Sequence, residues 1–307
     1  MFDWAWASAY QQHGVPYYPK AVIAVPFTPV PGARLLARTW SDRQALIEAL
    51  LAWCGQRDLS SLHVLFADDA DAIACESAGL MLRHTVQFHW NNAVEKYADF
   101  DQFLMSLTQE KRKKIRQERR KVIEAGVTFS KVRGTDITRS DWDFFYRCYE
   151  RTYLEHGNAP YLNRNFFELM AGTMPENWLL FIANRNNKPI ASSLIGISTG
   201  PENAGKSVAY GRYWGALERV DCLHFEACYY QPLQWCIANG FDRFEGGAQG
   251  EHKMARALMP VKTTSAHWLA HPSFADAVAR FLEREDQGIA SYMDELNERN
   301  PFRKSSP

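Results

Sequence analysis

The chain has 307 residues, more than a single compact core usually holds, and ordinary domain sizes would divide it into two units of about 150 residues. Hydrophobic residues make up 46% and charged residues 23%, no low-complexity tract is present, and the formal net charge is zero. This composition excludes a disordered chain and a protein that coats nucleic acid or an anionic membrane with its whole surface, so any such contact must be local.

The amino terminus and the cysteines favour a cytoplasmic protein. The first ten residues contain no basic segment followed by an apolar one, and nowhere do about 18 apolar residues run together. The six cysteines form no C-x-x-C pair, so we expect buried thiols in a reducing compartment rather than disulfides. Residues 2–6 resemble the middle of a packed element, and we therefore expect the first domain to begin upstream of Met1.

Short strands and helices alternate through the first part of the chain. Ser41 is a suitable N-cap, apolar residues follow it at helical spacing, and Gly55 is a typical stop. The predicted elements, in chain order, are a strand at 19–27, a helix at 41–56, a strand at 62–67, a helix at 68–79 and a strand at 80–90.

Residues 99–126 are predicted to form a helical link. Ser106 and Gln109 have the spacing of a capping box, and Gly126 supplies a stop. A thin apolar stripe at i, i+7 and i+8 would pack against the protein and consists of Ile115, Val122 and Ile123.

The same helix carries a concentration of positive charge. Between residues 109 and 121, eight basic residues oppose two acids, for a local charge of +6. Such a face is either simply solvated or binds the phosphates or carboxylates of a partner, such as RNA or a nucleotide-linked substrate. The docking residues we select are Lys113, Arg116 and Arg120.

The second half has an α+β order rather than that of a dinucleotide-binding ladder. Ser140 is expected to cap a helix, Asn186 and Asn187 lie in a hairpin turn, and Pro232 must kink a helix. The predicted elements are a strand at 127–133, helices at 139–157 and 164–171, a hairpin at 178–199, a strand at 207–215, a helix at 222–240 and a strand at 241–247.

Two familiar patterns fail in their context. Residues 200–207 match the phosphate-loop pattern G-x-x-x-x-G-K-[ST], but a strand follows them where that loop needs a helix. His267 and His271 have a spacing that suits a metal site on a helix, yet Pro272 follows at once and no carboxylate stands between them. We therefore expect neither a phosphate loop nor a metal site.

Polar residues on one strand and the next helix suggest part of a binding site. Alternation along strand 207–214 puts Tyr210, Arg212 and Trp214 on one face, where the arginine is either a packed, carboxylate-paired residue or an anion clamp. The following helix carries His224 and Glu226 in its first turn, and the carboxylate there is alternatively a partner of the helix dipole.

The segment FEGGAQGEHK, residues 244–253, has little to bury. Glu245 ends a predicted strand, and glycines and polar residues follow it. Glycines let backbone approach a ligand closely, and Glu and His supply proton acceptors, so we expect this segment to form one wall of an active site rather than a plain surface loop. Its candidate residues, with one further arginine, are Gln249, Glu251, His252, Lys253 and Arg256.

Several long segments resemble the FemAB-like predicted N-acyltransferases, a bacterial family labelled as peptidoglycan biosynthesis or recognition proteins. They are FDWAWASAY, YYPKAVIAVPFTPVPGARLL, PYLNRNFFELM, YGRYWGALERVDCLHFEACYYQ and FEGGAQGEHKMARALMPVKTTSAHW. The resemblance spans nearly the whole chain. It implies the GNAT-like acyltransferase superfamily and two tandem GNAT-like domains, with mixed, mostly antiparallel sheets flanked by helices.

The resemblance also implies a division of the chain. Residues 1–98 would be an N-terminally incomplete GNAT-like domain, since typical members carry further elements before FDWAWA. Residues 99–126 would be a basic helical linker, similar to the segment before the second domain of Fem-type aminoacyltransferases, and residues 127–307 the C-terminal GNAT-like domain.

One departure bears on the donor substrate. Acetyl-CoA-binding GNAT enzymes hold the pyrophosphate with a Q/R-x-x-G-x-G/A loop, whereas the matching junction here, YWGALERVDCLHFE, contains only Gly215. The resemblance therefore leaves two donors open, an acyl-CoA and an aminoacyl-tRNA. The implied acceptor is a small molecule or a muropeptide, and the oligomeric state is left open.

These observations lead to an expected N-acyltransferase that acts on an amine. Glu245 or Glu251 would be the general base and His252 its partner, while Arg212, Lys253 and Arg256 would contact anionic groups. The alternative is a non-catalytic binding protein on the same fold that recognises a peptidoglycan precursor or RNA.

Overall fold

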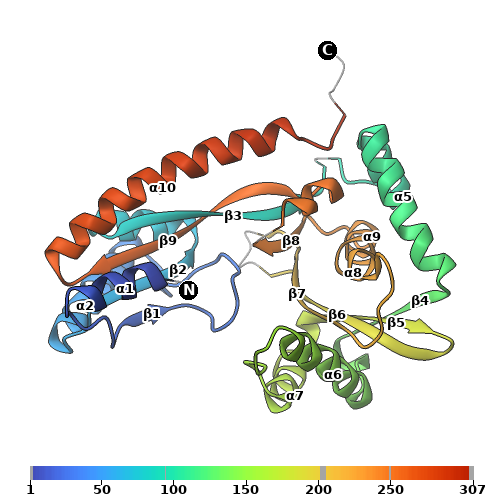
Figure 1. Ribbon diagram of the computed structural model, residues 1–307, viewed down its shortest axis with the longest axis horizontal. Helices are drawn as coiled ribbons and strands as arrows, with labels where there is room; N and C mark the ends of the chain where they lie inside the picture. The colour runs from blue at the N-terminus through green and yellow to red at the C-terminus, as the bar shows by residue number, and fades with distance from the viewer. Residues whose placement is uncertain (1–2, 94, 201–204, 249, 304–307) are drawn as a thin grey trace. The chain divides into compact units, whose positions relative to one another are not determined.

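The computed structural model describes residues 3–93, 95–200, 205–248 and 250–303, which form two compact units (Figure 1). The first unit comprises the described residues of Met1–Gln87 together with Val261–Glu298, and the second those of Phe88–Pro260 together with Arg299–Pro307. Two units were expected, but the segment Val261–Glu298, which the sequence-based boundaries place in the C-terminal domain, belongs to the first unit.

The first unit packs helices against a small mixed sheet. Strand β1 pairs in parallel with β2, and β2 pairs antiparallel with β9. Its core lies between this sheet and helices α2 and α3. Its elements are α1 (Trp4–Gln12), β1 (Ala21–Ile23), α2 (Trp40–Gln56), β2 (Ser61–Ala67), α3 (Asp69–Ser77), β3 (Met81–Asn91), β9 (Met259–Leu269) and α10 (Pro272–Glu298), of which β3 and β9 each run across the boundary of the unit.

The second unit is an antiparallel meander with one parallel strand added. The order is β8-β7-β6-β5-β4, in which only the pairing of β7 with β8 is parallel. Its strands are β4 (Val127–Arg133), β5 (Trp178–Arg185), β6 (Lys188–Ser198), β7 (Val208–Ala216) and β8 (Arg243–Ala248). Its helices are α4 (Phe100–Ser106), α5 (Gln109–Glu124), α6 (Arg139–Glu155), α7 (Arg164–Thr173), α8 (Leu223–Phe225) and α9 (Gln231–Ala238).

Helices cover both faces of this sheet. On one face, α6 and α7 pack on Leu180 and Ile182 of β5, and on the other face α5 and α8 pack on Ala183 and Ala191. Figure 1 shows the pair α6 and α7 on the opposite side of the strands from α8 and α9. A mixed sheet flanked by helices is the α+β class, and that prediction is confirmed.

Two predicted helix starts are wrong by two residues each. Helix α2 is capped by Thr39 instead of Ser41, and its side chain accepts the N–H of Asp42. Helix α6 is capped by Thr138 instead of Ser140, in a reciprocal capping box with Asp141. In both, the threonine has extended backbone, which lets its oxygen reach back to the first turn.

The basic link is two helices, α4 and α5, rather than one. The predicted capping box is wrong, because the Ser106 hydroxyl donates to the carbonyl of Phe103 and α5 begins after Thr108. The predicted apolar stripe is also wrong in one member, since Ile123 is 71% exposed. The buried positions are Ile115, Glu118 and Val122, so the inner side of α5 includes a carboxylate.

The helix at 222–240 changes its winding midway. A π-helical turn, Glu226–Tyr230, separates α8 from α9, and Pro232 follows that turn. Proline has no N–H to donate to the preceding turn, which explains why regular winding is interrupted near it; the kink predicted at Pro232 stays a prediction. Such turns are frequent at functional sites.

The six cysteines are free thiols, as expected. Four are buried, and Cys222 and Cys228 are partly buried. Among the described residues, no helix contains an apolar stretch long enough to cross a membrane.

Candidate functional site

The candidate site lies where the two parallel strands of the second unit stop pairing. Residues Val208–Tyr210 of β7 pair with Arg243–Glu245 of β8, and both strands continue beyond the pairing. The carboxyl ends of parallel strands, where neighbours part, are where ligands bind in open sheets. Glu245 stands at the last of these pairs.

The first glycine after Glu245 is required by packing. The strand predicted at 241–247 is present and ends one residue later, since β8 runs on to Ala248, and Glu245 therefore lies within the strand rather than at its end. A Cβ atom on Gly246 would lie 2.4 Å from the Leu258 side chain and 3.0 Å from the carbonyl oxygen of Phe88. Glycine therefore allows three segments to meet closely beside the carboxylate.

Glu245 is a buried carboxylate with one oxygen available. It is 3% exposed, and its Oε1 lies 2.8 Å from Nη2 of Arg243 and 3.9 Å from Nδ1 of His89. Its Oε2 has no hydrogen-bond partner in the part of the chain that the structure describes. Burial raises the pKa of Glu245 to about 7, against the opposing effect of Arg243.

The neighbouring side chains of Glu245 influence its ionisation. Burial, with the charges of Arg243 and Lys253, lowers the pKa of His89 to about 3, so this imidazole is neutral at pH 7. Arg243 is then the cation nearest the carboxylate. Glu245 is thus about equally protonated and ionised at neutral pH, which suits a group that takes up and returns a proton.

Lys253 ties the segment after β8 back onto the strand. Its Nζ donates to the carbonyl oxygens of Gly246, at 2.7 Å, and Gly247, at 3.2 Å. The side chain is buried, and burial lowers the pKa of Lys253 to about 8, with Cys228 opposing the shift. The lysine charge is therefore directed at backbone carbonyls beside the candidate site.

A second group of aromatic and imidazole rings includes His252. Its Nε2 lies 3.4 Å from the hydroxyl of Tyr229, on the π-helical turn, and His224 contacts both Tyr229 and Trp214 through its ring. Burial lowers the pKa of His224 to about 4, and burial together with the charges of Arg256 and Lys253 lowers that of His252. His252 is the exposed member of the group.

Three predicted site residues have ionic partners within the chain, two of them buried and one exposed. Arg256 is almost fully buried, and its Nη2 lies 2.8 Å from Glu118 of α5. Glu226 is paired at 3.0 Å with Arg119 of the same helix. Glu251 is exposed, with Arg299 at 2.9 Å.

The guanidinium of Arg256 has further contacts. Its Nη1 donates to the carbonyl of His252 at 2.6 Å, and its central carbon lies 3.5 Å from the centre of the Phe225 ring. The role of Arg256 as a ligand contact stays a prediction, and its observed contacts join α5 to the segment after β8.

A bulge interrupts the alternation predicted for β7. Gly211 pairs with Ile195 and Tyr213 with Leu194, which leaves Arg212 as the extra residue. Arg212 donates to the hydroxyl of Tyr213 at 3.0 Å, whereas Trp214 contacts His224, so the expectation of one shared face is wrong. Tyr210 sits at the last parallel pair, opposite Glu245, and Gln249 lies outside the described residues.

The basic helix presents its charges outward, as predicted. Lys113, Arg116 and Arg120 are exposed, and Arg116 has one distant ion pair, at 3.8 Å, with Asp101. In residues 3–93, 95–200, 205–248 and 250–303, neither Lys113 nor Arg120 has an ion pair or hydrogen bond from its side chain. This face of α5 therefore presents exposed cations.

Sequence reasoning missed three residues of the site. Arg243 lies two positions before Glu245 on one strand, and this spacing places both side chains on the same face of the sheet, which could have predicted their contact. Glu118 was also visible, as one of two acids in a basic run. His89 comes from a strand more than a hundred residues away and gave no local sign.

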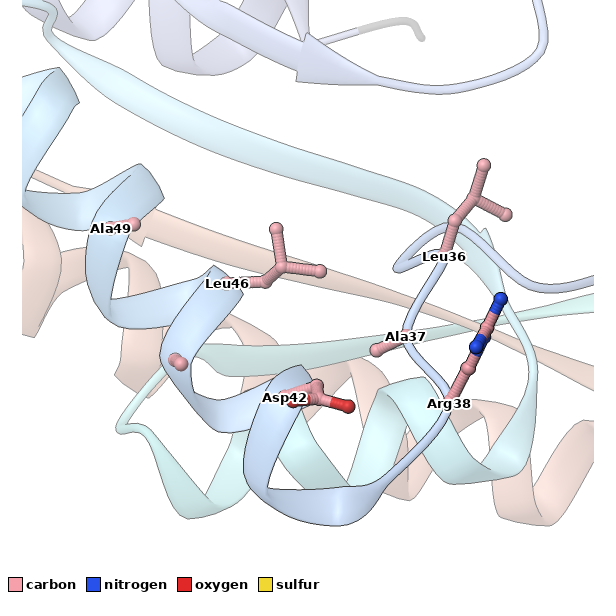
Figure 2. A pocket seen from close by; sticks show the side chains of 7 residues that line it. Leu36, Ala37, Arg38, Asp42, Leu46 and Ala49 are labelled. Carbon is pink, nitrogen blue, oxygen red and sulfur yellow. The ribbon is translucent and has the colours of Figure 1, made fainter.

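A hollow of about 430 Å³ lies in the first unit and contains none of the predicted site residues (Figure 2). It is lined by Leu36, Ala37, Arg38, Asp42, Ala45, Leu46 and Ala49. Across the described residues, no group of three or more His, Cys, Asp or Glu side chains is placed to hold a metal ion. The phosphate-loop pattern at residues 200–207 falls partly outside the described residues. In the two-histidine pattern, His267 lies on strand β9 and not on a helix.

The fold and site together define an α+β protein with a buried carboxylate whose pKa is about 7, at the point where the parallel strands β7 and β8 stop pairing. The sequence model of the FemAB-like family, described as peptidoglycan biosynthesis/recognition, matches residues 1–304. The chain therefore belongs to the FemAB-like family, and the resemblance stated from its sequence segments is confirmed.

The solved structures to which this chain is similar have very different sequences. The C-terminal domain of a putative lysylphosphatidylglycerol synthetase from Agrobacterium fabrum has a TM-score of 0.55 at 11% identity, covering 80% of this chain and 78% of its own. L-PGS from Bacillus licheniformis has a TM-score of 0.54 at 10% identity, covering 78% of each chain. A tandem GNAT protein from the clavulanic acid biosynthesis pathway has a TM-score of 0.47 at 10% identity, covering 78% of this chain and 73% of its own. No curated protein matches the sequence.

Proposed function

We propose that the protein is an N-acyltransferase that moves an acyl or aminoacyl group from a thioester or ester donor onto an amine. The observation that supports it most is Glu245, a buried carboxylate with a pKa of about 7 at the end of the parallel strand pair, whose Oε2 has no hydrogen-bond partner among the described residues. Membership of a family described as peptidoglycan biosynthesis/recognition supports an acceptor amine on a cell-wall precursor.

Glu245 would act as the general base. An acceptor amine arrives as an ammonium ion and becomes a nucleophile only after it loses a proton, which Oε2 accepts. The amine nitrogen then attacks the donor carbonyl, and the tetrahedral intermediate collapses as the bond to sulfur or oxygen breaks. The proton held on Glu245 passes to the leaving group, the nitrogen of the new amide releases its remaining excess proton to water, and the carboxylate is regenerated.

Of the two predicted bases, Glu245 is better suited than Glu251. Glu251 is exposed and paired with Arg299, so its carboxylate keeps an ordinary solvated environment. Glu245 is desolvated, which raises its basicity toward the working pH. His252, exposed beside Tyr229, would contact substrate at the entrance of the site.

The donor would bind partly through helix α5. Acyl-CoA and aminoacyl-tRNA both carry phosphates, and Lys113, Arg116 and Arg120 offer exposed cations on one helix. The region between β7 and α8 lacks the glycine-rich pyrophosphate loop, so the helix would supply the phosphate contacts instead.

The test is transfer with defined donors and a defined acceptor. Purified protein is incubated with acetyl-CoA or aminoacyl-tRNA and a muropeptide, and the acylated product is detected by mass spectrometry. We expect Glu245→Gln to lower kcat at least about 100-fold, the usual contribution of a positioned base, with its fold intact by circular dichroism.

Glu251→Gln is the matched control and should retain activity. Full activity of Glu245→Gln would contradict the assignment of the base. Binding of the muropeptide without binding of either donor and without product would instead support the non-catalytic recognition protein.

A further inference from the structure

Helix α2 is apolar on two sides. Ile47 and Cys54 are buried in the core of the first unit. On the other side, Leu46 and Trp53 are 39% and 45% exposed. A helix that covers a core needs one apolar side, so the second side of α2 is available to another surface.

The exposed side of α2 adjoins the hollow of Figure 2. Side chains from the first half of the helix and from the preceding loop, including Ala45 and Leu36, form its wall. Leu36 is 88% exposed, far more than its size would favour. The hollow and Trp53 therefore lie on one helix, about two turns apart.

We propose that two copies of the chain associate through this side of α2, with the two helices antiparallel about a two-fold axis at Ala49. Trp53 lies four residues after Ala49, and Ala45 lies four residues before it. In the antiparallel pair, both positions are displaced by about 6 Å in the same direction from the axis. Trp53 of each copy thus meets the hollow beside Ala45 of the other, and one patch supplies both the protruding ring and the hollow.

Charge favours the antiparallel arrangement. Asp42 lines the hollow near the start of α2, and Arg57 follows its end. Within the described part of the chain, neither side chain forms an ion pair. Antiparallel helices bring Asp42 of each copy opposite Arg57 of the other, whereas parallel helices would bring the two Asp42 carboxylates together.

The first test is the oligomeric state. Sedimentation velocity of the whole chain over a range of micromolar concentrations should show a monomer–dimer equilibrium. Trp53→Ala should raise the dissociation constant at least about tenfold, because a central tryptophan usually dominates an interface. Trp4→Ala removes another exposed tryptophan of the first unit, 71% exposed on α1, and should leave the equilibrium unchanged.

The second test examines the pairing itself. Asp42→Arg and Arg57→Asp should each weaken the dimer, and the double variant should restore it. Ala49→Cys should form a disulfide-linked dimer on oxidation, whereas Glu48→Cys, on the adjacent face, should not. Thermal unfolding of every variant reports whether the fold is kept.

A chain that stays monomeric throughout, or a dimer that responds equally to Trp53→Ala and Trp4→Ala, would overturn the proposal. So would a double charge variant that fails to restore association when each single variant has weakened it.

Discussion

Glu245 and Arg256 show how differently two buried charges behave. Within the described part of the chain, Oε2 of Glu245 has no hydrogen-bond partner, and burial raises the pKa of this carboxyl to about 7. Arg256 has its charge balanced by Glu118, which also accepts the hydroxyl of Tyr230. A buried carboxylate with one oxygen left over can accept a proton from a ligand, whereas breaking a fully paired buried charge destabilises the fold.

The first residue-scale prediction concerns the pH dependence of transfer. A general base must be ionised, so kcat/KM should fall about tenfold for each pH unit below the pKa of Glu245, about 7, and level off above it. The measurement is a pH profile with an acceptor whose amine titrates well above that range. A profile that stays flat from pH 5 to pH 8 would exclude Glu245 as the base.

The burial of ionised Glu245 should also lower the free energy of unfolding. Its folded pKa lies above the value of 4.5 for an unfolded carboxyl, so both states are protonated at low pH and stability is lost as pH rises from about 4.5 to about 7. Glu245→Gln should therefore raise the urea midpoint at pH 8 relative to the parent. Equal urea midpoints for the parent and Glu245→Gln at pH 8 would show that burying the ionised carboxylate costs no free energy.

The Arg256–Glu118 pair should be important for stability. Removing one partner leaves a buried charge unpaired, and we expect Arg256→Met to lower the free energy of unfolding by about 3–5 kcal/mol. Glu118→Met combined with Arg256→Met should recover much of this loss. Arg299→Met breaks the exposed pair with Glu251 and should cost less than about 1 kcal/mol. Comparable losses for Arg256→Met and Arg299→Met would refute the assignment.

Helix α5 combines two roles along its length. Its inner side is fixed by Ile115, Val122 and the Glu118 ion pair, and Arg119 holds Glu226 at the π-helical turn. The outer side keeps exposed cations. Because the inner contacts hold the helix in place, the outer charges form the ordered surface on which we propose that the donor's phosphates dock.

At the scale of this element, we predict a salt-dependent donor interaction. Replacing Lys113, Arg116 and Arg120 by alanine should weaken binding of a phosphate-bearing donor and reduce the slope of log affinity against log salt, by roughly one for each lost phosphate contact. Fluorescence anisotropy at several salt concentrations measures both effects. A control triple variant of the exposed Lys131, Arg139 and Lys188 removes equal charge elsewhere in the unit. If both triple variants bind alike, α5 is not the docking surface.

At the scale of the whole molecule, buried histidines in both units predict sensitivity to acid. Burial lowers the pKa of His63 and His224 to about 4 and that of His89 to about 3, and it lowers the pKa of His267 as well. Unfolded histidines bind protons below about 6.5 while these do not, so stability should fall as pH decreases from about 6.5 to about 4.

Urea unfolding at pH 7.5 and pH 5 measures this effect. His63→Gln should lessen the loss between the two pH values, by up to about 1.4 kcal/mol for each unit of pKa shift. Substitution of the exposed His13 or His156 should not change it. Equal stability of the parent at both pH values would contradict the expectation.

Local pattern was enough to determine most of the strands and helices. The hairpin of β5 and β6 follows from alternation and from Asn186 and Asn187, which adopt the left-handed conformation that a tight turn requires. Helix α5 follows from its charge pattern, and Glu245 from its place beside three glycines. These features depend on neighbours in sequence, and sequence segments alone also identified the family.

Tertiary structure decided what depends on distant partners. Only folding shows that Val261–Glu298 joins the first unit, that His89 lies beside Glu245, and that Arg256 is paired with Glu118 across more than a hundred residues. A carboxylate's pKa follows from its burial and from the charges around it, and neither is written in the adjacent residues. The sequence alone therefore determined the class of protein and which residue types could react, while the packing decided which carboxylate is free.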